Sequence, residues 1–335
     1  MVDGKVLAAR FAGAADFETR KVISGGNELE IFFLDGLTSG RDIADFIVRP
    51  LHEARQDERE ETLFTRAERG LVWCASMKEA SSTDEAAELL VNGFCVILFP
   101  KTGKALACEV KTGEKRSPSA PEAENTVKGA KDAFTETLRT NTSLIRRHLR
   151  TPELRLEESV VGRRSLTKIT VCWVEGLTDP ELPARMKKRL GEIDIDGLLS
   201  PAAVEEYVTG SRKTAFPLLE FTERTDHFCQ GLLDGQVGLL VDGLPIGYLA
   251  PVSFGRLMRS PEDRATDYLS ASMLRSLRYL ALGVSLLLPG IYAAMAMFHQ
   301  QMLPTKLLLS IVESKQDVPF STLFEVVGLL CAFEL

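Results

Sequence analysis

The apolar positions of the chain divide it into two kinds of sequence. Residues 279 to 312 contain a single formally charged side chain, Lys306, whereas the rest of the chain alternates charged and apolar residues. No charge occurs from Tyr279 to Phe298, and a helix of that length, at about 1.5 Å per residue, crosses the ~30 Å hydrocarbon core of a bilayer. The pattern predicts a soluble part joined to a membrane part.

Basic residues lie mainly on the N-terminal side of this predicted span. Beyond the span the next basic residues are Lys306 and Lys315, whereas five arginines precede it: Arg256, Arg259, Arg264, Arg275 and Arg278. Because positively charged flanks stay on the cytoplasmic side, the upstream part is predicted to be cytoplasmic. The N-terminus agrees, since its charges interrupt any apolar stretch long enough for a signal peptide.

Pro289 and Gly290 lie in the middle of the span. A proline there removes one backbone hydrogen bond and kinks the helix, which in lipid requires a compensating neighbour. Two interpretations remain open, a bundle helix that lines a pathway and an ordinary tolerated kink. A second apolar stretch, Val318 to Phe333, is interrupted by Glu325 and runs to the end of the chain, which suggests a multi-pass membrane domain that is C-terminally truncated.

Upstream of the span the chain contains two related copies of one pattern. A strand-like run from Leu29 to Leu34 leads into Asp35-Gly36-Leu37-Thr38, and the run from Lys168 to Val174 leads into Glu175-Gly176-Leu177-Thr178. A second match, in the same order, pairs the helix-to-strand passages that begin at Thr83-Asp84 and Thr225-Asp226. Two such matches at nearly the same spacing predict a duplicated α/β unit.

Local signals add detail to this unit. The sequence Thr178-Asp179-Pro180-Glu181 predicts a capping box and a helix over residues 180 to 190, and Asp242-Gly243 predicts a hairpin between 237–241 and 246–252. Asp35 and Glu175 follow strands, where α/β sheets bind ligands, so a metal or phosphoacceptor role is one interpretation. The favoured interpretation is a turn carboxylate near a helix N-terminus, because neither copy supplies a second acidic partner.

The most strongly patterned segment is an amphipathic helix between the two copies, after an exposed loop at 111–124. Its apolar arc contains Ala130, Phe134, Leu138, Ile145 and Leu149, whereas Arg139, Arg146 and Arg150, with Arg147 nearby, lie on the opposite side. Asn141 falls inside the apolar arc, where it should bond to a partner or fix one packing register. The arginines form either a solvated face paired with Glu153, Glu157 and Glu158 or a surface for an anionic partner or lipid headgroups.

Composition narrows the class of protein. The 335 residues are 45% hydrophobic and 26% charged, which excludes disordered, collagen-like and small disulfide-stabilised chains. The part upstream of residue 277 carries a net charge of −6, from 37 basic and 43 acidic residues, and is not expected to bind nucleic acid. The six cysteines form no C-x-x-C pair and no zinc-type cluster with the four histidines, and no cofactor or metal is predicted.

Several segments together resemble the signature of the spore germination protein A subunit (GerA) family. They are Ala133 to Thr142, Leu144 to Arg147, Leu149-Arg150, Gly162 to Ser165, Val174 to Leu182, Phe221-Thr222-Glu223-Arg224, Leu239 to Gly243, Ser260 to Asp263 and Leu303 to Thr305. The resemblance covers 125–335 strongly and 29–110 more weakly. It marks Arg139, Asn141, Arg146, Arg147, Arg150, Glu223 and Arg224 as partner-binding or structural signature residues.

The resemblance implies a non-enzymatic membrane subunit of a germinant receptor complex that couples nutrient sensing to germination and ion release. It places the chain in the inner membrane of the spore as a multi-pass protein with a cytoplasmic N-terminal region. The implied partners are a permease-like B subunit, a C subunit lipoprotein and the lipid bilayer, and a homo-oligomer is also open. The related stage V sporulation protein AF is an alternative that these motifs separate poorly.

A membrane-tethered α/β enzyme that binds nucleotide is a weaker alternative, because the chain lacks the common phosphate-binding and hydrolase motifs. The expected domains are a first α/β unit with linker (1–124), an amphipathic basic connecting helix (125–158), a second α/β unit (159–255), a juxtamembrane segment (256–276) and the start of the membrane domain (277–335). We also expect Arg146→Glu combined with Arg147→Glu to impair complex assembly without unfolding the soluble part.

Overall fold

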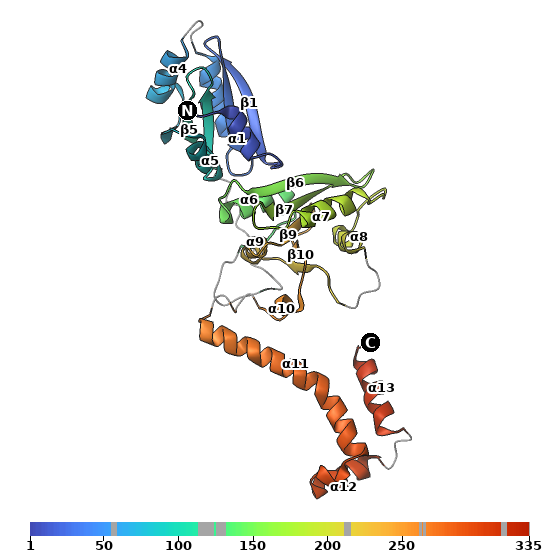
Figure 1. The fold of residues 1–335 in the computed structure, drawn as a ribbon. Helices are drawn as coiled ribbons and strands as arrows, with labels where there is room; N and C mark the ends of the chain where they lie inside the picture. Colours follow the sequence, from blue (N-terminus) through green and yellow to red (C-terminus); the bar gives the residue numbers. More distant parts are fainter. Residues whose placement is uncertain are drawn as a thin grey trace. The chain divides into compact units, whose positions relative to one another are not determined.

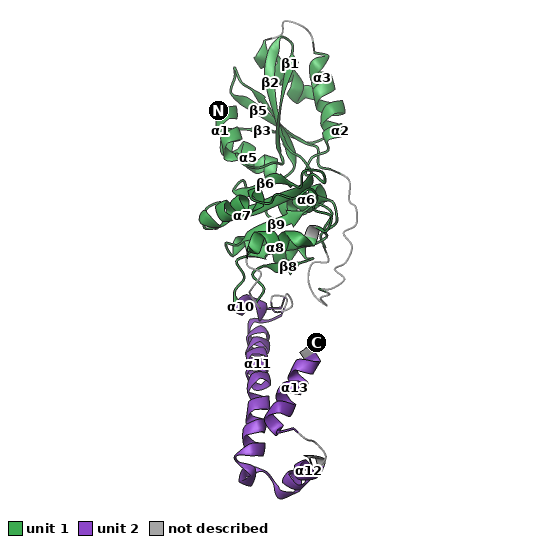
Figure 2. Cartoon of the chain, turned by 90° about the vertical axis from the view of Figure 1, so that its right-hand side faces the viewer, with its two compact units in different colours: residues 1–253 green, residues 254–335 purple. Residues whose placement is uncertain are grey.

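The computed structural model describes residues 1–54, 59–112, 124, 132–210, 216–260, 263, 266–315 and 320–334. The chain forms two compact units, residues 1–253 and 254–335 (Figure 2). Within the first unit we call residues 1–112 the first lobe and residues 132–253 the second lobe. Each lobe contains one five-stranded sheet.

The sheet of the first lobe is antiparallel and has the strand order β1-β2-β4-β5-β3. Its strands are β1 (Phe17–Ser24), β2 (Asn27–Leu34), β3 (Met77–Ala80), β4 (Phe94–Phe99) and β5 (Lys104–Glu109). Its helices are α1 (Gly4–Arg10), α2 (Gly40–Asp42), η1 (Ile43–Val48), α3 (Arg49–His52), α4 (Glu60–Arg66), η2 (Ala67–Leu71) and α5 (Thr83–Val91). The central strand β4 is buried at all six positions because helices cover both faces of the sheet.

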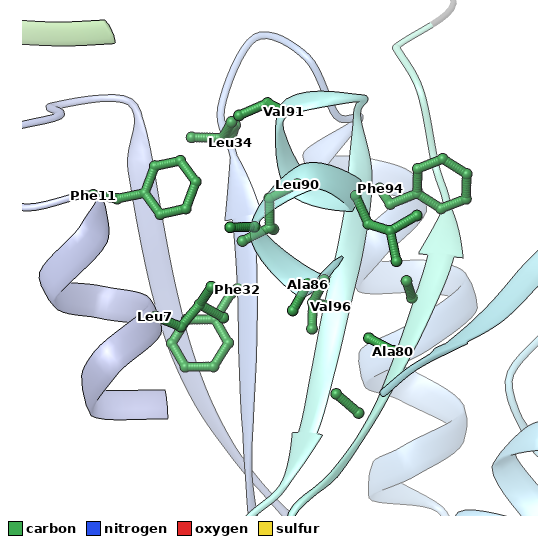
Figure 3. Close-up of a cluster of buried hydrophobic side chains, with 14 of the residues drawn as sticks. Leu7, Phe11, Phe32, Leu34, Ala80, Ala86, Leu90, Val91, Phe94 and Val96 are labelled. Carbon is green, nitrogen blue, oxygen red and sulfur yellow. The ribbon is translucent and has the colours of Figure 1, made fainter. Parts of the chain in front are cut away.

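Local chemistry explains where the helices of this lobe begin and pack. At α5 the Ser82 hydroxyl accepts a hydrogen bond from the Glu85 amide, while the Glu85 carboxylate accepts one from the Ser81 amide. The apolar sides of α1 and α5 then lie on one face of the sheet, where Leu7 and Leu90 are fully buried (Figure 3). The second core of the lobe lies on the other face and includes residues of η1, α3 and α4.

The second lobe repeats this arrangement, with the strand order β6-β7-β9-β10-β8 and antiparallel pairing throughout (Figure 1). Its strands are β6 (Leu154–Val161), β7 (Thr167–Val174), β8 (Glu220–Thr222), β9 (Val237–Val241) and β10 (Gly247–Ala250). Its helices are α6 (Leu138–His148), α7 (Glu181–Gly191), η3 (Pro201–Ala203), α8 (Val204–Thr209) and α9 (Thr225–Leu233). Each strand has a counterpart in the first lobe at the same place in the sheet, so the predicted duplication is confirmed.

The sheets are antiparallel, which removes the argument for the less favoured interpretation of Asp35 and Glu175, a metal or phosphoacceptor role. These residues do follow β2 and β7, but the ligand-binding edge of an α/β sheet arises where parallel strands end together. An antiparallel sheet has no such edge, so the strand-end argument for a metal or phosphoacceptor fails here.

Other local predictions have mixed outcomes. The helix expected at 180–190 is α7, but the Thr178 hydroxyl donates to the carbonyl of Gln236, and the carboxylate of Asp179 accepts from the Glu181 amide instead. The hairpin of β9 and β10 is confirmed, with Gly243 at a φ of +82°. The connecting helix is shorter than predicted, because α6 ends at His148 and residues 154–158 belong to β6; residues 125–131 and most of the expected loop at 111–124 lie outside the described residues.

The unit formed by residues 254–335 is helical. It contains α10 (Phe254–Leu257), α11 (Tyr268–Met297), η5 (Gln300–Met302), α12 (Thr305–Lys315) and α13 (Thr322–Glu334). Among the described helices α11 alone is long and apolar enough to cross a membrane; it begins 11 residues before the predicted span and contains Pro289. The shorter apolar helix α13 packs against α11 and covers part of the second apolar stretch.

An ion pair between the buried carboxylate of Asp263 and the partly exposed Arg278 holds the segment before α11 onto that helix. The guanidinium of Arg278 donates to both carboxylate oxygens of Asp263 at 2.7 and 2.6 Å and to the Met258 carbonyl at 3.0 Å. The Phe254 ring packs on the Tyr279 ring with 6.3 Å between centroids. Arg278, one of the five arginines that precede the predicted span, therefore has a protein partner.

Candidate functional site

The candidate site is a hollow of about 640 Å³ between the first lobe and α6. Two segments form most of its wall, the turn that follows β2 and the polar side of α6. The lining residues are Asp35, Gly36, Thr38, Ser39, Gly40, Arg41, Thr112, Thr135, Arg139, Thr140, Ser143, Leu144 and Arg147. Three guanidinium groups, one carboxylate and several hydroxyls thus face one space.

Asn141 fixes the start of α6. It is fully buried, its amide oxygen accepts from the Thr135 amide at 2.8 Å, and its amide nitrogen donates to the Thr135 carbonyl at 2.6 Å. The carboxylate of Asp242 accepts from the amide of Leu138 at 3.1 Å and so caps the same end. The expectation that Asn141 bonds to a partner is confirmed, and the partner belongs to the same chain.

Arg146 lies in the interior and does not face solvent. Its side chain is 1% exposed, and it donates to the two carboxylate oxygens of Asp16 at 2.7 and 3.0 Å and to the Thr151 carbonyl at 3.2 Å. The prediction that it belongs to a cationic surface is wrong, because Asp16 comes from the first lobe and supplies the opposite charge. The expectation that Arg146→Glu leaves the soluble part folded fails for the same reason, since it would bury two carboxylates together.

The other three arginines of the predicted cationic face are partly exposed or exposed, and Arg150 lies just after the end of α6. Arg139 pairs with Asp35 at 3.0 Å and with Glu158 at 3.4 Å, so it spans the two lobes. Arg150 donates to the carbonyl of Arg147 at 3.3 Å and to the side chain of Asn92 at 3.5 Å, and Arg147 faces the hollow. The arginines of the predicted cationic face therefore have three different environments. Arg146 forms a buried ion pair, Arg139 pairs with carboxylates of both lobes, and Arg147 and Arg150 lie at the surface.

Glu223 and Arg224 tie the segment before α6 to the second lobe. The Glu223 carbonyl accepts from the Phe134 amide at 2.8 Å, and Arg224, 2% exposed, pairs with Asp226 at 2.6 Å. Burial opposes ionisation of Asp226, but the hydrogen bonds and charge of Arg224 outweigh it and lower the pKa of that carboxyl. Pro289 and Gly290 lie inside α11, in the other unit.

Three features of the structure, outside the lining of the hollow, were not found from the sequence. Asp16 lies in no motif and Asp263 stands only at the end of a family-like segment, and their ion pairs with Arg146 and Arg278 reveal what they do. The half-buried thiol of Cys74 accepts a hydrogen bond from Cys108, which lowers the pKa of Cys74 to about 6 and raises that of Cys108. In both cases the signal is a contact between residues far apart in the chain.

The chemistry of the hollow suits a small solute with a carboxylate or phosphate group, held by Arg139, Arg147 and hydroxyl donors. Glu175, the counterpart of Asp35, pairs with Arg155 at the surface. No group of three or more histidine, cysteine, aspartate or glutamate side chains among the described residues is placed to hold a metal ion. The described chain thus combines a duplicated antiparallel α/β unit, a polar hollow beside α6 and one helix that is long and apolar enough to cross a membrane.

Comparison with known proteins agrees with this class and adds the family. The family model described as Bacillus/Clostridium GerA spore germination protein matches residues 5–335, and the chain belongs to this family.

Individual relatives support the assignment. The chain is 32% identical over 307 residues to the uncharacterized membrane protein YfkQ of Bacillus subtilis (strain 168), covering 91% of this chain and 59% of that protein. It is 31% identical over 307 residues to spore germination protein KA of the same strain, covering 92% and 56%. The chain thus spans less than two thirds of the length of either relative.

A solved structure shows the same fold. The crystal structure of the N-terminal domain of the A subunit of the Bacillus megaterium spore germinant receptor GerK3 aligns with a TM-score of 0.57 and 24% identity. The alignment covers 75% of this chain and 93% of that one.

Proposed function

We propose that the protein is a non-enzymatic membrane subunit of a spore germinant receptor complex, which couples nutrient sensing to germination and ion release. The family match over residues 5–335 carries this proposal, because it includes both the two-lobed unit and the membrane-length helix. The proposed location is the inner membrane of the spore, with the N-terminal region cytoplasmic and further membrane passes provided by the helices around α11. The proposed partners are a permease-like B subunit and a C subunit lipoprotein.

Within this proposal the hollow beside α6 holds a small anionic solute. Arg139 is the central residue, because it lines the hollow and also bridges Asp35 and Glu158. A solute carboxylate would compete with Asp35 for this guanidinium and so change how α6 is held against the first lobe.

Gene deletion in the native host tests the proposal. We expect the mutant spores to lose germination in response to at least one nutrient, and the intact gene supplied in trans to restore it. Unchanged germination with every nutrient, in a strain without a paralogue, would contradict the assignment.

One second candidate has specific support. Stage V sporulation protein AF of Bacillus subtilis (strain 168) is 28% identical over 273 residues, covering 81% of this chain and 55% of that protein. Co-purification separates the two candidates, because recovery of B and C subunits with the chain supports the germinant receptor. Recovery of a different sporulation assembly without them supports the second candidate.

A further inference from the structure

The turn after the second strand of each lobe is covered in the first lobe and open in the second. In the first lobe it contains Gly36 and Leu37, and in the second Gly176 and Leu177, with φ of +87° and +83° at the two glycines. In both lobes the turn packs on the glycine that ends the following helix: the Cβ position of Gly93 is 3.5 Å from the Leu37 carbonyl oxygen, and that of Gly235 is 3.0 Å from the Leu177 carbonyl oxygen. The two turns are therefore structural equivalents.

Helix α6 covers the turn of the first lobe. A Cβ built on Gly36 would lie 3.0 Å from the Cβ of Ser143 and 3.7 Å from the carbonyl oxygen of Arg139. One turn of helix before Ser143, Arg139 pairs with Asp35 across this contact. The helix that docks on this turn thus has a small residue, Ser143, where it comes closest to Gly36, and an arginine, Arg139, one helical turn earlier.

The equivalent surface of the second lobe has no such cover. Among the described residues, no atom beyond its chain neighbours lies within 4 Å of a Cβ built on Gly176. Leu177 is 55% exposed, whereas its counterpart Leu37 in the first lobe is 7% exposed. At the end of α9, Leu233 is 44% exposed, whereas its counterpart Val91 at the end of α5 is 3% exposed. Leu177 and Leu233 therefore form an exposed apolar surface, which we call the step, at a place that is buried in the first lobe.

Acidic residues surround this step. Glu175 precedes Gly176, its amide bonds to the Glu153 carbonyl, and Asp234 lies beside Leu233. The exposed acidic residues of the step and its rim are Glu153, Glu175, Asp179, Glu181 and Asp234. One arginine, Arg155, pairs with Glu175, so the acidic charges still outnumber the basic charge at this rim. An apolar centre with an acidic rim is complementary to a helix with a small apolar face and basic flanks.

We propose that this surface, centred on Leu177 and Leu233, docks a basic amphipathic helix of a different polypeptide, as α6 docks on the first lobe. A second copy of this chain is a poor occupant, because its α6 already covers its own first lobe. The second copy could instead offer α1, which is the counterpart of α6 in the first lobe. The buried pairs Leu7 with Ile145 and Phe11 with Leu149 align the two helices. At the positions of Arg146 and Arg147 in α6, α1 therefore has Ala8 and Ala9, which are not basic. The inference rests on the repeat and does not depend on the proposed function.

Site-specific photo-crosslinking of the full chain in the native host tests this proposal. A photoreactive benzoylphenylalanine replaces Leu177 in one strain and Leu199, a 92% exposed leucine of the same lobe, in a matched control strain. We expect Leu177 to give a crosslink at least about tenfold above the control, as for a residue at the centre of an interface. Mass spectrometry should map it to another polypeptide, in a helical segment with lysine or arginine within one turn.

A second variant separates docking from folding. Leu233→Ser in the Leu177 crosslinking strain should reduce the crosslink about tenfold while leaving thermal unfolding of the protein unchanged, because the leucine is already partly exposed. Crosslinks to a second copy of this chain, to an acidic or non-helical segment, or at no more than the control yield would each overturn the proposal.

Discussion

Single side chains in this protein act across long stretches of sequence. Asp16 and Arg146 are separated by 130 residues, and both are buried at the junction of the lobes. The helical wheel placed Arg146 on a polar face correctly, but that face is turned towards the first lobe at this position. The pair therefore fixes the junction and is unavailable to a partner.

Removal of one member of the pair should destabilise residues 1–253 strongly. Arg146→Met leaves the Asp16 carboxylate buried without its counter-charge, which costs about 3–5 kcal/mol of unfolding free energy. Urea unfolding of this unit measures the effect, and Arg150→Met, at an exposed arginine two residues after the end of α6, is the control with an expected cost of about 1 kcal/mol or less. Equal losses for the two variants would show that the buried pair has no special weight.

Cys74 should be the most reactive thiol of the first unit near neutral pH. Its pKa of about 6 means that the reactive thiolate is already the main form at pH 7, whereas burial raises the pKa of Cys229 to about 12. Iodoacetamide labelling of residues 1–253 followed by peptide mass spectrometry should show the rate at Cys74 rising from pH 5 and levelling above pH 7. A rate that keeps rising through pH 8.5 would indicate an ordinary thiol.

Helices and turns acquire their roles from what they pack against. Gly36 and Gly176 occupy equivalent turns with the same left-handed backbone, yet only Gly36 has α6 against it. The same local sequence, glycine followed by leucine and threonine, thus makes a buried joint in one lobe and an exposed step in the other.

This difference gives a matched pair of substitutions. Gly36→Ala and Gly176→Ala both pay the strain of a left-handed alanine, about 1–2 kcal/mol, but Gly36→Ala also pushes its methyl group against Ser143. We expect it to lower the unfolding free energy of residues 1–253 by about 1 kcal/mol more than Gly176→Ala. Identical unfolding free energies for the two variants would mean that α6 moves away from the new methyl group without loss of stability.

The segment before α11 offers a second test of this kind. Asp263→Asn removes the charge that Arg278 binds, so residues 254–260 should exchange their amide hydrogens faster in detergent micelles, with the N-terminus of α1 as an unaffected reference.

Acid should have the same effect as this substitution. Hydrogen bonds from Arg278 hold the pKa of Asp263 below its usual range, and a group whose pKa is lowered by folding contributes stability above its unfolded pKa of about 3.9 that is lost as pH falls. The ion pair between Asp263 and Arg278 should therefore persist at pH 5 and be lost only below pH 4. Opening between pH 5 and 7 would contradict this assignment.

Residues 1–253 and residues 254–335 differ in the side chains that they leave exposed. Residues 1–253 bury two cores in each lobe, whereas the large apolar side chains of α11 remain exposed, as lipid contact requires. The solved N-terminal domain of a germinant receptor A subunit corresponds to the first of these units.

Separation of the units should leave the first one intact. We expect residues 1–253 to stay in the aqueous fraction without detergent and to unfold within about 2 °C of the same unit in the full chain, whereas the full chain requires detergent. Circular dichroism melting and phase partitioning provide the two measurements. Aggregation of the fragment, or a water-soluble full chain, would show that the second unit packs onto the first.

Much of the architecture was predictable because it depends on local pattern. The repeated strand, turn and helix signals identified both lobes, and the charge-free run around Leu287 identified the membrane-length helix. Strand direction was not predictable, since a buried central strand such as β4 reads as continuously apolar in either kind of sheet. The candidate hollow was predictable only in its α6 wall, because the turn at Gly36 carries no sign in its sequence of the helix that covers it.

Hydrophobic periodicity and turn chemistry were thus sufficient for the order of helices and strands, for the duplication and for the apolar span, since each arises from neighbours within a few residues. Burial of Arg146, exposure of Leu177 and pairing of Asp263 with Arg278 follow instead from how distant segments meet. Identical residue types at equivalent positions of the two lobes end in different surroundings because α6 lies against the turn at Gly36, whereas no described segment lies against the turn at Gly176. Contact with a distant partner sets the free energy of a buried charge or an exposed leucine, and local sequence does not carry that information.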